Sequence, residues 1–120
     1  MKNKTLVLGA SEDPGRYSNL AIRRLVRTGH PVLAIGKKAG NVEGVEILTA
    51  PVTTDEIDTV TLYLNPLHQQ PYYDYIVSLK PKRIIFNPGA ENEELEQLAQ
   101  KEGIEPIEAC TLVMLSTGQY

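Results

Sequence analysis

The sequence lacks the features that mark several large classes of protein. Its single cysteine, Cys110, excludes an intramolecular disulfide framework and favours a reducing, cytoplasmic location. The first residues have no apolar core of a secretory signal, and no apolar run approaches the roughly 20 residues that cross a bilayer. Because 15 acidic residues outnumber 12 basic ones, a general basic surface for nucleic acid is not expected. We therefore expect neither a membrane nor nucleic acid among its partners.

What is present suits one domain of ordinary size. A chain of 120 residues can bury about two-thirds of the surface that it exposes when unfolded, around a single hydrophobic core. No internal repeat or low-complexity segment divides the sequence. We therefore expect one domain over residues 1–120.

Short apolar runs bounded by glycine, proline or asparagine predict strands, because they are too short for helices. These runs lie at residues 5–8, 31–35, 45–48, 58–64, 83–86 and 104–107. Apolar residues at helical spacing predict three helices between them. The first is expected from a Ser18 cap to Gly29, the second from between Pro66 and Pro71 to about Leu79, and the third from an Asn92 cap to Gly103.

Three further segments are less regular. The Thr-x-x-Glu spacing of Thr53 and Glu56 predicts a short helical turn after Pro51, and the polar, glycine-containing segment 36–46 predicts a loop. The tail 108–120 is expected to pack on the sheet, either as a short strand or as a helical turn. Strands that alternate with helices predict an α/β fold: a three-layer, Rossmann-like open parallel sheet of about five to six strands, order 3-2-1-4-5 with a further strand.

The loop after the first strand is the first candidate for ligand binding. A strand, a tight turn and a helix start direct backbone N–H groups and a helix dipole at one crevice, which favours an anion. The loop begins at Gly9 but departs from the G-x-G-x-x-G pattern of NAD-binding domains, since Ser11 and Pro14 replace the second and third glycines. Ser11 and Arg16 can bind phosphate oxygens instead. The alternative is a turn in which Gly9 only relieves backbone strain.

The exit of the second strand differs from an NAD-binding domain as well. Such a domain places an Asp or Glu there to bond the ribose, whereas this strand is followed by Gly36, Lys37 and Lys38. Two positive charges suit a ribose that carries a further phosphate, as in NADP or in the 3′-phosphorylated adenosine of coenzyme A. Two lysines on a solvated loop are the alternative interpretation.

Three stretches together resemble the small CoA-binding-domain family. They are Gly9-Ala10-Ser11-x-x-Pro14-x-Arg16-x-Ser18, the exit with Lys37-Lys38, and the Asn92-Glu93-Glu94 helix followed by Gly103, a strand and Cys110. Members are stand-alone Rossmann-like domains similar to the CoA-binding domain of succinyl-CoA synthetase α subunits. The resemblance implies CoA or an acyl-CoA as ligand. It places Gly9, Ala10, Ser11, Arg16 and Ser18 near the phosphates, and Lys37 or Lys38 near the 3′-phosphate.

Two departures from the family pattern concern strand exits. Gly36-Lys37-Lys38 stands where many members have Asn-Pro-Lys, and Glu108-Ala109-Cys110 stands where many have Asp-Arg-Cys. The loops after the fourth and fifth strands reach the same edge of the sheet and complete the predicted crevice. Their candidate residues are Asn65, Pro66, His68, Asn87 and Gly89.

No residue of the chain is predicted to be catalytic or to bind a metal. His68 is a candidate for ligand contact rather than a general base, and Cys110 is expected to be a small core residue rather than a reactive thiol. The acidic cluster around Glu93 and Glu94 fits a solvated helix start better than a metal site.

The sequence therefore predicts a module that binds CoA or a short acyl-CoA without catalysis of its own. An alternative is an NADP-binding, reductase-like protein, although 120 residues leave no room for the usual substrate domain. Another is an accessory subunit of an acyl-CoA ligase, which would work with a partner chain. A third is an interaction module in which segment 112–115 meets another protein. A protein partner is thus possible, but the sequence does not identify one.

Overall fold

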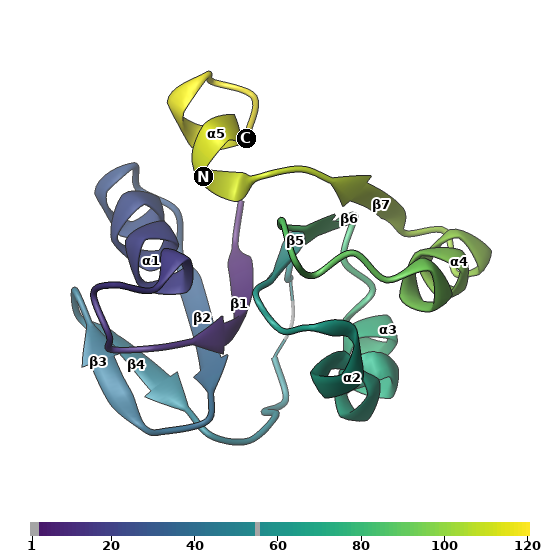
Figure 1. The fold of residues 1–120 in the computed structure, drawn as a ribbon, viewed down its shortest axis with the longest axis horizontal. Helices are drawn as coiled ribbons and strands as arrows, with labels where there is room; N and C mark the ends of the chain where they lie inside the picture. Colours follow the sequence, from purple (N-terminus) through teal and green to yellow (C-terminus); the bar gives the residue numbers. More distant parts are fainter. Residues whose placement is uncertain (1–2, 55) are drawn as a thin grey trace.

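The computed structural model describes residues 3–54 and 56–120, which form a sheet flanked by helices on both faces (Figure 1). The sheet has seven strands in the order β3-β4-β2-β1-β5-β6-β7. Their bounds are β1 Thr5–Ala10, β2 Val32–Gly36, β3 Gly40–Val42, β4 Val45–Leu48, β5 Thr59–Leu62, β6 Arg83–Phe86 and β7 Glu105–Glu108. This arrangement confirms the expected open α/β sheet.

Six of the strands are parallel and follow the predicted order, but the number of strands was underestimated. β3 lies in the segment predicted to be a loop, and it pairs antiparallel with β4 at the edge of the sheet. Its turn uses Glu43 and Gly44, both with positive φ, of 52° and 86°. Two such residues in succession are typical of a tight β-hairpin. Gly44, one of the glycines on which the loop prediction for segment 36–46 rested, therefore belongs to a hairpin.

The helices form the outer layers of the sandwich (Figure 1). α1 (Tyr17–Arg27) and α5 (Thr111–Ser116) pack on one face and contact each other. The other face is covered by α2 (Pro66–Gln69), a 3₁₀ turn η1 (Gln70–Tyr72), α3 (Tyr73–Leu79) and α4 (Glu93–Lys101). The tail, for which the sequence left strand and helix open, is therefore helical.

Alternate residues of the strands supply the two halves of the core. Leu6 and Leu8 of β1 pack with Phe86 in the cluster beneath α3 and α4. Val7 points to the opposite face, where it packs with Ile22 of α1. All five side chains are at most 1% exposed, as expected for a parallel sheet covered on both faces.

Two predicted local features are wrong. Helix α1 begins at Tyr17 with Arg16 at the N-cap position, so Ser18 lies buried in the first turn and does not cap the helix. Residues 51–54 and 56–58 contain no helical turn, and Asp55 of the predicted capping box lies outside the described residues. The Tyr75 hydroxyl donates to the Val52 carbonyl (2.9 Å) and the Lys4 ammonium to the Thr54 hydroxyl (3.1 Å). These contacts fix the segment without a helix.

Tyr120 packs against the amino edge of the sheet, where it contacts the first residues of β1 and β6. Arg83 donates to the Tyr120 carbonyl oxygen at 2.8 Å, and its guanidinium carbon lies 4.5 Å from the centre of the Tyr120 ring. The Tyr120 hydroxyl is hydrogen-bonded to Thr5, and burial raises the pKa of this tyrosine. The tail therefore packs on the sheet, as the sequence predicted.

A substitution tests how closely β1 and β2 approach at the carboxyl edge. A Cβ atom on Gly36 would lie 2.2 Å from the Ala10 carbonyl oxygen, which is backbone and cannot rotate away. We expect Gly36→Ala to lower the free energy of unfolding by about 2 kcal/mol, because overpacking forces the strands apart. Urea unfolding measures the loss. Gly15→Ala is the control, since a Cβ there meets only the Asp13 carboxylate, at 3.3 Å. Equal stability of the two variants would contradict the prediction.

Candidate functional site

The predicted binding residues come from loops that share one edge of the sheet. β1 pairs in parallel with β2 and β5, and β5 pairs in parallel with β6, so these four strands end side by side. With strands about 4.8 Å apart, the exits of β2 and β6 are separated by about 14 Å. The structure thus brings the predicted residues to a common edge, in the order β2, β1, β5, β6.

Gly9 shapes the centre of this edge. The pairing of β1 with β2 shifts register between Leu8 and Ala10, and Gly9 at the shift has a φ of 94°. A Cβ atom on Gly9 would lie 3.0 Å from the Tyr63 backbone carbon. The position therefore needs glycine for its conformation and for the close approach of β5, and Ala10 after it is buried. Contact of Gly9 or Ala10 with a ligand stays a prediction.

The loop from Ser11 to Arg16 holds its own shape by hydrogen bonds. The Ser11 hydroxyl accepts from the Asp13 amide at 3.0 Å, and the Asp13 carboxylate accepts from the Gly15 amide at 2.9 Å. The side chain of Asn19, which is 4% exposed, donates to the Ser11 carbonyl at 3.0 Å. Sequence reasoning missed Asn19, although a polar residue next to the apolar stripe of α1 was a signal. Hydrogen bonds within the protein therefore hold the loop in this conformation.

Several donors beside this loop remain available. Within the described part of the chain, the backbone amides of Tyr17 and Ser18 at the start of α1 donate to no acceptor. The Ser11 hydroxyl accepts a bond but still has its own hydrogen to donate. Arg16 lies 4.0 Å from Asp13, and its side chain is 72% exposed. These groups can bind an anion at the helix start.

The β2 exit presents positive charge to solvent. Lys37 and Lys38 are both exposed, and neither forms an ion pair with any residue that the structure describes. On the same connection, the amide of Asn41 donates to the carboxylate of Glu12, which reaches across from the first loop (2.8 Å). This contact was not predictable from the sequence, because Glu12 and Asn41 are 29 residues apart.

The β5 exit uses two of its predicted residues to start a helix. The Asn65 side chain accepts from the His68 amide at 3.0 Å, and Pro66 is the first residue of α2. Asn65, Pro66 and His68 are all exposed, so they lie at the edge and can be reached from solvent. Binding through these side chains is not tested by the structure.

Asn87, a candidate for ligand binding at the β6 exit, is buried in the structure. This side chain is 2% exposed, and it donates to the Leu62 carbonyl (2.9 Å) and the Thr61 hydroxyl (2.7 Å). It also accepts from the Thr111 amide at 2.8 Å. Both amide protons are thus used inside the protein, so Asn87 joins β5, β6 and α5. Gly89, with a φ of 92°, is exposed at the tip of the same loop.

A second buried network supports the same edge. The Gln69 side chain, which is fully buried, donates to the carbonyl oxygens of Leu64 and Ala90 at 2.8 Å each. Asn92 donates to the Gln69 side chain and to the Tyr73 hydroxyl, also at 2.8 Å. It also caps α4, as predicted. The network ties the β5 and β6 loops together, and its bonds to the protein interior were not predicted for Gln69, which the sequence placed with Asn65 and His68 near the crevice.

The β7 exit contains Cys110, which is half-buried and precedes α5 rather than lying in the core as predicted. The nearby Tyr63 hydroxyl is enclosed, and it meets no partner in hydrogen-bonding geometry among the described residues. Burial, and secondarily the Cys110 thiol, raises the pKa of Tyr63 above its usual range. The tyrosine therefore stays neutral. In the described residues, no group of three His, Cys, Asp or Glu side chains could hold a metal ion.

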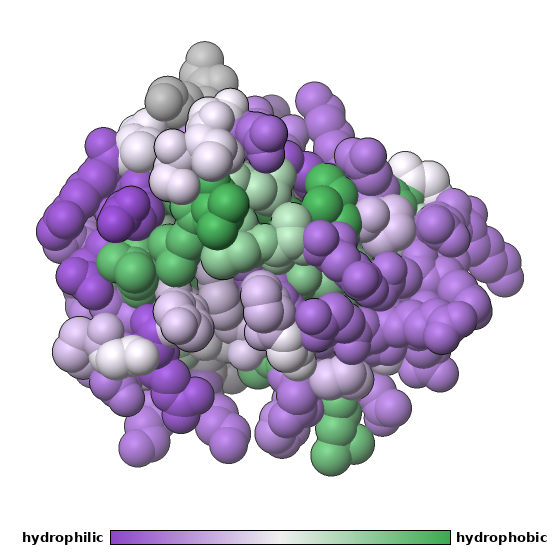
Figure 2. All heavy atoms as spheres, turned by 45° about the horizontal axis from the view of Figure 1, so that its top comes forward, coloured by the Kyte–Doolittle hydropathy of each residue, from purple (hydrophilic) through white to green (hydrophobic). Residues whose placement is uncertain are grey.

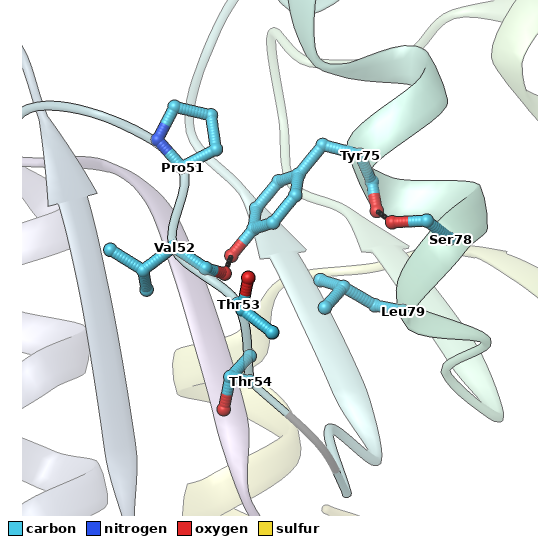
Figure 3. A pocket seen from close by; sticks show the side chains of 7 residues that line it. All are labelled: Pro51, Val52, Thr53, Thr54, Tyr75, Ser78 and Leu79. Carbon is cyan, nitrogen blue, oxygen red and sulfur yellow. Dashed lines mark hydrogen bonds between the residues drawn. The ribbon is translucent and has the colours of Figure 1, made fainter.

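Two cavities lie away from this edge. One of about 350 Å³ lies between α3 and segment 51–54, where Tyr75 and Leu79 line it (Figure 3). The other, of about 330 Å³, is lined by residues near the amino edge that include His30 and Tyr120. Neither is lined by a predicted binding residue. None of the helices in residues 3–54 and 56–120 has the length and apolar character that a membrane span needs.

The face that carries α5 leaves apolar surface exposed. Val113 is 55% exposed. Figure 2, which brings the top of Figure 1 forward, shows an apolar area surrounded by hydrophilic residues. Contact of segment 112–115 with another protein stays a hypothesis.

Comparisons with known proteins agree on the fold and on one family. A family model described as a CoA binding domain matches residues 3–116, whereas no curated protein matches. A crystal structure of an uncharacterized protein is 51% identical, with a TM-score of 0.97 over 100% of this chain and 99% of that one. A hypothetical protein from Pyrococcus horikoshii OT3 is 22% identical, with a TM-score of 0.87 over 96% and 82%.

A larger protein contains a similar unit. Acetyl-coenzyme A synthetase 1 from Ca. Korarchaeum cryptofilum, solved in complex with phosphate and ADP, is 21% identical with a TM-score of 0.71. The match covers 89% of this chain but 25% of the synthetase chain. At this distance the likeness concerns the fold alone.

Proposed function

The chain belongs to the CoA-binding domain family, and from this premise we propose that it binds coenzyme A or a short acyl-CoA at the carboxyl edge of its sheet. The observation that carries the proposal is the set of donors at two neighbouring exits. At one exit the amides of Tyr17 and Ser18, and at the other the ammonium groups of Lys37 and Lys38, have no partner among the residues that the structure describes. A diphosphate and a ribose phosphate are the groups that such donors recognise.

The proposed ligand lies across the four strand exits. Ser11, Arg16 and the amides of Tyr17 and Ser18 bind the diphosphate, with Gly9 and Ala10 beneath it. Lys37 or Lys38 binds the 3′-phosphate. The other half of the edge offers Asn65, Pro66, His68 and Gly89, with Asn87 as a buried support, to the part of the ligand beyond the diphosphate. We propose no catalytic residue, because no paired base and nucleophile accompany these donors among residues 3–54 and 56–120.

Isothermal titration calorimetry with four ligands tests the proposal. CoA is expected to bind more tightly than dephospho-CoA, because only CoA presents a 3′-phosphate to the lysines. NADP and NAD are expected to bind more weakly than CoA. Absence of heat with CoA would remove the proposed ligand, and equal affinity for CoA and dephospho-CoA would remove the assignment of the lysines.

Two alternatives keep the same edge but change its use. An NADP-dependent reductase would show hydride transfer with NADPH. An accessory subunit of an acyl-CoA ligase would copurify with a larger partner. We also propose a cytoplasmic location, because a chain with a single cysteine fits a reducing compartment. This location is compatible with the proposed function and with both alternatives.

A further inference from the structure

Glu12 links two loops at the carboxyl edge by filling a space that a glycine leaves open. Its Oε2 atom accepts from the Asn41 amide at 2.8 Å. A Cβ atom on Gly40 would lie 2.3 Å from Glu12 Cδ and 2.8 Å from Oε1, so a larger residue there would displace the carboxylate from this position. The negative charge therefore occupies a position defined by backbone, although the residue as a whole is exposed.

The carboxylate lies on the β2 side of the edge. Gly40 pairs with Ile47 of β4, which also pairs with Ala34 of β2. The connection from β2 to Gly40 contains Lys37 and Lys38, so Glu12 meets the backbone just after the exit to which the ribose phosphate is proposed to bind. Rossmann-like domains that bind an unphosphorylated ribose also have a carboxylate near this exit, supplied by β2 itself. Here the first loop supplies it.

We propose that Glu12 is a specificity-determining residue that opposes the ribose 3′-phosphate. The inference rests on the proposed function. A carboxylate and a phosphate are both anions that accept from amides and lysines, and like charges a few ångströms apart repel. Glu12 accepts from the Asn41 amide, so its negative charge lies at the backbone three residues beyond Lys38. It therefore limits the preference for CoA over dephospho-CoA.

The variant Glu12→Gln removes the charge and keeps an oxygen that can accept from the Asn41 amide. Calorimetry with CoA and dephospho-CoA is expected to show about fivefold tighter binding of CoA than in the unaltered protein, and a change of less than about twofold for dephospho-CoA. The gain is expected to shrink at high salt, because exposed charges are screened. The matched control is Glu46→Gln, which removes the same charge from an exposed position of β4, in the hairpin that also contains Asn41.

The outcomes separate this inference from the proposed function. Unchanged or weaker CoA binding by Glu12→Gln, in a protein that binds CoA before the substitution, overturns the role of Glu12 and leaves the proposed function standing. An equal gain in Glu46→Gln also overturns it, because net charge would then explain the effect. Absence of CoA binding in both the unaltered protein and Glu12→Gln overturns the proposed function, and the role of Glu12 with it.

Discussion

Asn87→Leu is expected to lower the free energy of unfolding by about 3 kcal/mol, because a leucine of similar size cannot replace the bonds of the amide. The Asn87 side chain joins the Leu62 carbonyl, the Thr61 hydroxyl and the Thr111 amide. The Thr61 hydroxyl keeps a bond to the Thr111 hydroxyl at 2.8 Å. The carbonyl and the amide lose their side-chain partner in a buried place, and each unpaired group costs about 1–3 kcal/mol.

Urea and thermal unfolding followed by circular dichroism measure this loss. The midpoint of thermal unfolding is expected to fall by about 10 °C. Gln100→Leu is the control, because it removes an amide from an exposed position of α4 and is expected to change stability by less than about 0.5 kcal/mol. If the two variants were equally stable, the buried amide would not hold the β5, β6 and α5 segments together.

The parallel strands and their order were predictable because periodicity and strand order obey general rules. Leu6 to Leu8 and Ile84 to Phe86 are short apolar runs between breakers, and they are buried on both faces of the sheet. β3 could not be predicted in the same way. Its residues Gly40 to Val42 have no apolar pattern, and its pairing depends on a turn at Glu43-Gly44.

The parts of the candidate site whose position follows from the order of strands, loops and helices were predictable. The contacts between side chains far apart in sequence were not. The edge at Gly9 and the lysines at the β2 exit follow from the strand–loop–helix pattern. The buried bonds of Gln69 were not predictable, because its partners Ala90 and Asn92 come from another strand exit. Asn87 looked like a ligand-binding residue for the same reason, since only the fold reveals that Thr111 uses its oxygen.

The double variant Lys37→Glu/Lys38→Glu is expected to weaken CoA binding about 100-fold, which corresponds to about 2.7 kcal/mol. Both side chains are exposed and free of ion pairs with the described residues, so reversing them turns attraction for a 3′-phosphate into repulsion without breaking a structural contact. Dephospho-CoA lacks that phosphate and retains only the more distant diphosphate, so its affinity is expected to fall less than about fivefold. Calorimetry with both ligands gives the ratio.

The ratio of the two affinities, rather than either one alone, isolates the 3′-phosphate, because general charge effects act on both ligands. Lys80→Glu/Lys82→Glu changes the net charge by the same amount at the amino edge, just before β6, and is expected to leave the ratio unchanged. If CoA and dephospho-CoA weakened equally in the Lys37→Glu/Lys38→Glu protein, the lysines would act only through the overall field. The ribose phosphate would then have to bind elsewhere, and the positive charge at the β2 exit would no longer distinguish a CoA site from any other dinucleotide site on this fold.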